Sequence, residues 1–93
     1  MNWVVRIADD AQVFIDHLPA KIRRQVSRSI SQLEQDPFQG DVKALQGRAW
    51  KGYYCKRTGD YRIIFFVHHS QRIVDVSWVL LRSDKTYHKF RQL

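Results

Sequence analysis

The stretch RTGDYRIIF, residues 57–65, joins a polar turn directly to an apolar strand. Gly59, between Thr58 and Asp60, is typical of a tight turn between antiparallel strands, because glycine accepts the backbone angles that such turns need. Residues 61–68 are apolar at nearly every position, which indicates a central strand buried on both faces. The stretch therefore predicts a hairpin in the middle of a β-sheet.

Three further strands are predicted around this central strand. Residues 53–57 lead into the turn, and residues 73–81 alternate apolar with polar side chains, which is typical of a strand with one buried face. In that alternation Val74, Val76, Trp78 and Leu80 share one face. Residues 3–7 are rich in β-branched and aromatic side chains, so they predict a short first strand.

Two helices are predicted between the first strand and the hairpin. Asp9 and Asp10 favour a helix start, and apolar residues follow at helical spacing as far as Leu18. A second helix is expected over residues 20–36, because one face of it is apolar and Pro37 stops it.

The element order predicts the fold class. A strand, two helices and three strands give the order β-α-α-β-β-β, an α+β arrangement. We expect a small twisted antiparallel sheet with the two N-terminal helices packed on one face, in a single domain over residues 1–93. The other face of the sheet is expected to stay open.

Charge is distributed unevenly along the chain. The formal net charge is +7, but residues 1–42 hold five Lys or Arg against six Asp or Glu, whereas residues 43–93 hold eleven against three. A basic half favours nucleic acid or another polyanion as partner, and a solubilising surface is the simpler alternative. Short apolar runs predict no membrane-spanning helix. The single cysteine and the lack of a leader predict a cytoplasmic protein.

Five residues are candidates for a site on the open sheet face. Arg57 and Arg62 flank the turn, and Arg62 is expected to be exposed because burying an unpaired arginine is costly. Arg82 ends the last strand, and Tyr87 and His88 follow it. Guanidinium groups bind phosphate oxygens with paired hydrogen bonds, so convergence of these side chains would suit phosphate chemistry.

Simpler interpretations exist for the same residues. An arginine beside a turn is often solvated or ion-paired, and Asp60 is a possible partner. His68 and His69 point to opposite faces of a strand end, so we predict no metal site. The sequence contains no phosphate-binding glycine motif, so we predict no cofactor. Cys55 is expected to pack rather than to react.

Further cations extend the candidate footprint. Three of them form a stripe on the second helix, where a solvated helix face is the simpler interpretation. The residues assigned to RNA binding are Lys51, Lys56, Lys85, Lys89, Arg91, Lys21, Arg24 and Arg28.

Several motifs together resemble the RelE/ParE superfamily of bacterial toxins. They are a Leu-Pro break before a basic helix, then Asp36-Pro37, Leu45-Gln46-Gly47 and the stretch 57–65, with Arg82 and Tyr87 near the C-terminus. The resemblance covers nearly the whole chain and is stronger to the RelE branch. The pair Tyr87-His88 also resembles the HigB branch.

This resemblance implies the toxin of a type II toxin–antitoxin pair, a ribosome-dependent mRNA endoribonuclease that uses the ribose 2′-hydroxyl and no metal. It implies that Arg57 and Arg62 contact the scissile phosphate, and that Arg82 is a phosphate ligand or general acid. Tyr87 would stack on or orient a base. The implied partners are a cognate antitoxin and the ribosome with mRNA, including 16S rRNA contacts.

One departure concerns proton transfer. Cys55 stands where the family often has a lysine or arginine, so the general base is open among Lys51, Lys56 and His88, although Lys56 is expected to point to the wrong face. Two alternative functions remain at this point. They are a non-enzymatic ParE-like inhibitor of DNA gyrase and a catalytically weakened paralogue that only binds.

Overall fold

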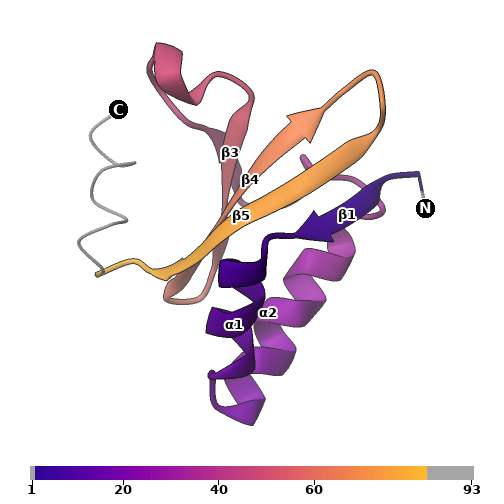
Figure 1. Cartoon of the computed structure of the whole chain (residues 1–93). Coiled ribbons are helices and arrows are strands. Elements are labelled where there is room, and N and C mark those ends of the chain that lie inside the picture. Colours follow the sequence, from indigo (N-terminus) through magenta and orange to yellow (C-terminus); the bar gives the residue numbers. More distant parts are fainter. Residues whose placement is uncertain (1, 84–93) are drawn as a thin grey trace.

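The computed structural model describes residues 2–83, which form a five-stranded sheet and two helices (Figure 1). The elements are β1 (Val4–Ile7), α1 (Asp9–Asp16), α2 (Ala20–Gln32), β2 (Val42–Ala44), the 3-10 turn η1 (Arg48–Trp50), β3 (Tyr53–Thr58), β4 (Tyr61–His68) and β5 (Ile73–Leu81). Neither helix of residues 2–83 has the length and apolar character needed to cross a membrane. The predicted α+β class is confirmed.

The strand order is β1-β5-β4-β3-β2, which places β4 in the centre as its apolar sequence predicted. The prediction of a purely antiparallel sheet is wrong, because β1 pairs with β5 in parallel, from Val4 opposite Ile73 to Ile7 opposite Val76. β1 and β5 are far apart in sequence, and their pairing direction depends on how the two helices lead the chain back to the sheet. Local sequence patterns carry no information about that path.

A fifth strand, β2, was not predicted. Its three residues pair with β3, with Val42 opposite Lys56 and Ala44 opposite Tyr54. A three-residue strand is too short to show alternation, so the segment between Gly40 and Gly47 has the sequence of a loop.

The second helix is shorter than expected. It ends at Gln32, and the backbone N–H groups of Leu33 and Glu34 donate to carbonyls three residues earlier, in a tightened last turn. The restriction that Pro37 places on the residue before it explains why the helix does not continue to residue 36.

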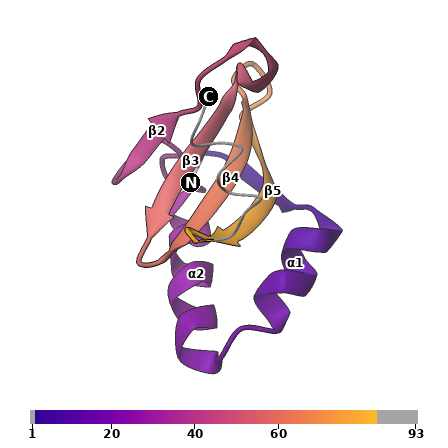
Figure 2. The same ribbon diagram turned by 90° about the vertical axis from the view of Figure 1, so that its left-hand side faces the viewer.

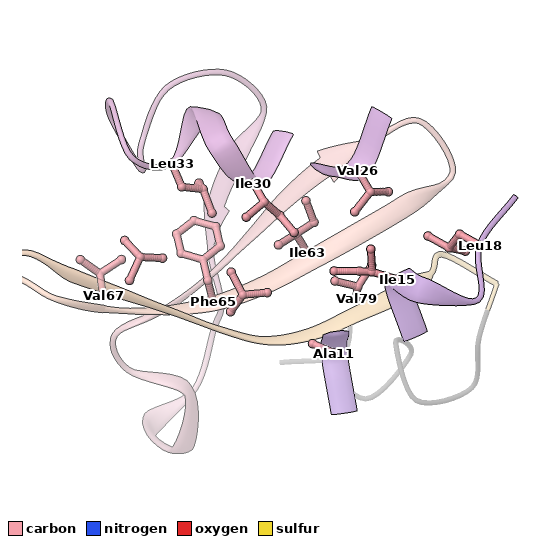
Figure 3. Packing of buried hydrophobic residues seen from close by; sticks show 12 residues of the cluster. Ala11, Ile15, Leu18, Val26, Ile30, Leu33, Ile63, Phe65, Val67 and Val79 are labelled. Atoms are coloured by element: carbon pink, nitrogen blue, oxygen red, sulfur yellow. The ribbon is translucent and has the colours of Figure 1, made fainter. Parts of the chain in front are cut away.

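Both helices pack on one face of the sheet, as predicted (Figures 1 and 2). Figure 3 shows the core between them, where Ile63 and Phe65 of β4 meet Val26 and Ile30 of α2 and Ile15 of α1. Phe65 is fully buried. Removing such a ring from a packed core costs about 3–5 kcal/mol, so this face holds the fold together.

A β-bulge reverses the faces of β5 halfway along the strand. Ile64 pairs with Trp78 and Phe65 pairs with Val76, which leaves Ser77 as the extra residue. Val76 therefore joins the core under the helices, whereas Trp78 lies with Ile64 on the opposite face. The predicted common face of Val74, Val76, Trp78 and Leu80 is wrong beyond the bulge.

Candidate active site

The face of the sheet opposite the helices is built from three rows of side chains across β3, β4 and β5. Residues paired across strands point to the same face, so the register places each row. The rows are Arg57, Arg62 and Leu80; Cys55, Ile64 and Trp78; and Tyr53, Phe66 and Asp75. We call this surface the open face, although the expectation that it stays open is wrong for Arg62, Ile64 and Leu80, which are buried.

Arg57 is the exposed member of the first row. It lies directly opposite Arg62, which confirms that the turn makes the two arginines neighbours. Its side chain is 57% exposed, and one guanidinium nitrogen lies 3.6 Å from a carboxylate oxygen of Asp41. An exposed ion pair of this length is weak, so an incoming phosphate can compete for the guanidinium.

Arg62 lies on the predicted face but is buried, so the prediction of an exposed side chain is wrong. Only 6% of the residue is exposed. Its Nη1 donates to the carbonyl oxygens of Gly59 and Tyr61, each at 2.9 Å. These charge-assisted bonds offset part of the cost of burying the guanidinium, and they tie it to the turn between β3 and β4.

Arg82 lies beside the same turn. Its backbone N–H donates to the carbonyl of Asp60 at 2.9 Å, and the residue is exposed. The end of β5 and the β3–β4 turn lie together in Figure 1. The backbone of Arg82 therefore lies near Arg57 and Arg62, at one end of the sheet, and we call these three residues the arginine cluster.

The remaining candidates near the C-terminus lie outside the described residues. They are Tyr87, His88, Lys85, Lys89 and Arg91. Their assigned roles, including the HigB-like Tyr-His pair, stay predictions.

Lys56 does not belong to the open face. It is 4% exposed, and its Nζ donates to the carbonyl of Ser29 at 3.1 Å and to Oε1 of Gln32 at 2.9 Å, both on α2. Burial lowers the pKa of its ammonium group. The assignment of Lys56 to RNA binding is therefore wrong, and the expectation that it points away from the open face is confirmed.

The cations of α2 line a hollow of about 320 Å³. Its described lining residues are Lys21, Arg24, Gln25 and Arg28. All four are exposed. Gln25 also approaches Gly59 of the β3–β4 turn, so this basic surface lies next to the hairpin that carries the arginine cluster. Lys51, another residue that the sequence assigned to RNA binding, directly follows η1 and is exposed.

Cys55 packs in the middle row of the open face against Ile64. Burial raises the pKa of its thiol to about 11, although the nearby Arg62 lowers it. A thiol with this pKa is almost entirely protonated at neutral pH, so Cys55 is a poor nucleophile or base. Packing is the role that its environment supports.

Sequence reasoning missed an aromatic cluster on the open face. The rings of Trp50, Tyr53, Phe66 and Trp78 contact one another there. The tryptophans and tyrosine are visible in the sequence, but only the bulge in β5 and the fold of η1 bring them together. Strand parity alone placed Trp78 on the wrong face.

Asp75 anchors a polar network at the far end of the open face. Arg6 on β1 donates to both of its carboxylate oxygens, at 2.7 and 2.9 Å, and Nε2 of His68 lies 2.7 Å from Oδ2. The hydrogen bond from Arg6 lowers the pKa of Asp75. His69 instead stacks on Phe38, so the two histidines do point apart. Across residues 2–83, no group of three or more His, Cys, Asp or Glu side chains is placed to hold a metal ion.

Comparison with known proteins gives matches in structure only. No protein-family model matches the sequence, and no curated protein sequence does. The fold is similar to that of an archaeal RelE–RelB complex from Pyrococcus horikoshii OT3, with a TM-score of 0.76, 26% identity, and coverage of 89% of this chain and 98% of that one.

Two further solved structures have the same fold at lower identity. The toxin–antitoxin complex RelBE2 from Mycobacterium tuberculosis has a TM-score of 0.76 and 23% identity, and the match covers 88% of this chain and 100% of that one. A YoeB/ParE toxin from Agrobacterium tumefaciens has a TM-score of 0.68 and 21% identity, over 84% of this chain and 96% of that one.

Proposed function

The chain has the fold of the RelE/ParE superfamily of toxins, and from this fold we propose that it is the toxin of a type II toxin–antitoxin pair. We propose further that it is an endoribonuclease that cleaves mRNA in the decoding site of the ribosome. The observation that carries this proposal is the arginine cluster, in which arginines on β3, on β4 and directly after β5 have their backbones beside one turn.

The reaction needs no covalent intermediate on the protein. The ribose 2′-oxygen loses its proton and attacks the adjacent phosphorus, a new P–O2′ bond forms, and the P–O5′ bond breaks. The leaving 5′-oxygen takes a proton, and a 2′,3′-cyclic phosphate remains. Negative charge grows on the phosphate oxygens in the transition state, so fixed guanidinium groups accelerate the step.

The structure supports different roles for the three arginines. Arg57 and Arg82 are exposed and are the candidate phosphate ligands. Arg62 holds the carbonyls of the turn with one nitrogen, so it fixes the hairpin that presents Arg57. Cys55, with its high pKa, is not the general base, and His88 stays the candidate for proton transfer.

Two partners belong to this proposal. The basic hollow on α2 adjoins the arginine cluster and offers Lys21, Arg24 and Arg28 to the phosphates of 16S rRNA. A cognate antitoxin is the second partner, which is supported by the fold shared with toxins that were solved in complex with an antitoxin. A partly disordered acidic segment would be complementary to the basic surface.

The experiment is controlled expression of the chain, with mapping of mRNA 5′ ends in the cells. We expect growth arrest with cleavage phased to codons, and loss of both with Arg57→Ala. Arg72→Gln is the matched control, because Arg72 is an exposed arginine that packs over Trp3 at the far end of the sheet. Growth arrest with intact mRNA would refute the nuclease.

The structural similarity to a YoeB/ParE toxin supports one alternative to the nuclease function, namely non-enzymatic inhibition of DNA gyrase. The same expression experiment separates the two functions. Gyrase inhibition would induce DNA damage signalling and block replication while mRNA stays intact, and Arg57→Ala would leave the toxicity in place.

A further inference from the structure

Four aromatic side chains form an aromatic patch on the open face, namely Trp50, Tyr53, Phe66 and Trp78. Tyr53 is central: its ring centroid lies 5.0 Å from that of Phe66 and 5.4 Å from that of Trp50. Trp50 and Trp78 lie 6.2 Å apart. All four residues are half-buried. Edge-to-face contacts hold the rings in fixed orientations.

The aromatic patch continues the surface of the arginine cluster. Tyr53 and Phe66 are a cross-strand pair on β3 and β4, and Arg57 and Arg62 are another pair on the same two strands and the same face. The pairs are separated by four residues, or about 13 Å along the strands. The row of Cys55, Ile64 and Trp78 lies between them, and Ile64 is fully buried, so a ligand would reach the two pairs as separate contact regions.

Cations border the aromatic patch at both ends. Arg48 and Lys51 are exposed and flank Trp50 in the chain, opposite the arginine cluster. The carboxylate of Asp75 beside Phe66 is paired with Arg6 and His68, which reduces its repulsion of an anion. A ligand that matches this surface carries negative charges along its length and flat apolar groups between them.

We propose that the aromatic patch stacks unpaired bases of the RNA whose scissile phosphate lies at Arg57 and Arg82. This inference rests on the proposed function and adds a second contact region to it. Single-stranded nucleic acid has the required chemistry, because every base has a flat face that an aromatic ring can contact, and the phosphates meet the flanking cations. Bases in a duplex are already stacked and are not available.

The test compares two RNA oligonucleotides of equal length, one intact and one with abasic residues, in equilibrium binding to the purified chain. Both carry the same phosphates, so the difference in affinity measures the bases. We expect the intact strand to bind about 5-fold tighter or more, the size of one stacked base. Tyr53→Leu should bring the ratio close to one. Phe38→Leu is the control, because Phe38 is an exposed ring that packs on Tyr54, outside the aromatic patch.

Equal affinity of the wild-type chain for the two strands would overturn the inference, and so would an unchanged ratio in a folded Tyr53→Leu variant. If that variant does not fold, tryptophan fluorescence of the wild type decides, with quenching expected for the intact strand alone. A Tyr53→Leu defect confined to binding of a partner protein would also refute base stacking. Cleavage of mRNA without a base-dependent affinity ratio would refute base stacking on the aromatic patch and leave the nuclease proposal in place. A base-dependent ratio without cleavage would refute only the nuclease proposal.

Discussion

Arg57 and Arg62 are paired across two strands, yet their side chains lie in different environments. Arg57 is exposed beside Asp41, whereas Arg62 is buried under the turn and bonded to two backbone carbonyls. Proximity of the two arginines was predictable from strand parity. The burial of Arg62 was not, because it depends on carbonyl positions that exist only once the turn has formed.

We expect Arg62→Ala to destabilise the fold by about 1–3 kcal/mol, because the carbonyls of Gly59 and Tyr61 lose a charged donor in a buried place. Arg57→Ala should change the free energy of unfolding by less than about 0.5 kcal/mol, because an exposed ion pair contributes little. Urea denaturation of both variants measures the difference. Equal stability of the two variants would contradict the assignment of Arg62 to the turn.

Gly52 offers a second test at the scale of one residue. It has a φ of +90°, and a Cβ there would lie 2.6 Å from the Phe66 ring. Gly52→Ala should therefore cost more than backbone strain alone, which is about 1–3 kcal/mol. Gly40→Ala is the control, because Gly40 has a φ of +88° and open space around it. Thermal unfolding that ranks the two variants equally would show that Phe66 can move away.

At the scale of elements, the sequence predicted which segments are helices and strands better than it predicted how the strands pair. The ends of β4 were predicted correctly because a buried strand has a continuous apolar pattern, and those of β5 because its apolar residues alternate with polar ones. The parallel partner of β1, the short β2 and the bulge at Ser77 were missed, since each follows from contacts between distant segments. The aromatic patch was missed for the same reason.

The attachment of β1 to the sheet should depend on pH. Asp75 on β5 accepts hydrogen bonds from Arg6 on β1, which lowers its pKa below the ordinary value of 3.8. A carboxylate with a lowered pKa in the folded state stabilises the fold above its unfolded pKa, and this contribution is lost as pH falls through the folded pKa.

We therefore expect Asp75→Asn to lower the free energy of unfolding at pH 7 and to make less difference below about pH 4. The effect should be modest, because the Asp75 side chain is 31% exposed. Denaturation of both proteins at several pH values measures it. A gap between wild type and variant that is the same at pH 7 and pH 3 would contradict the role of the Asp75 charge.

At the scale of the whole molecule, two basic surfaces lie beside the β3–β4 turn in residues 2–83, namely the arginine cluster and the hollow on α2. The excess charge of the second half of the chain predicted a polyanion partner, but it did not point to the cations of α2, which lie in the first half. The stripe on α2 borders a hollow of about 320 Å³, and its described lining residues are all exposed, as on a solvated helix face.

Binding to ribosomes should therefore weaken with salt, and the α2 cations should contribute to this dependence. Arg24→Gln is expected to reduce the slope of log affinity against log salt by about 1, because one phosphate contact is lost. Arg72→Gln should leave the slope unchanged. A slope that Arg24→Gln does not alter would show that the hollow on α2 stays in solvent.

The central claim is that the arginine cluster supports attack by a ribose 2′-hydroxyl. Its most direct test uses purified ribosomes programmed with two mRNAs that differ by one 2′-deoxy substitution at the cleaved nucleotide. We predict cleavage of the all-ribose mRNA by the wild-type chain, with a 2′,3′-cyclic phosphate end, and none of the substituted mRNA. Cleavage of the 2′-deoxy mRNA at the same position would contradict the account.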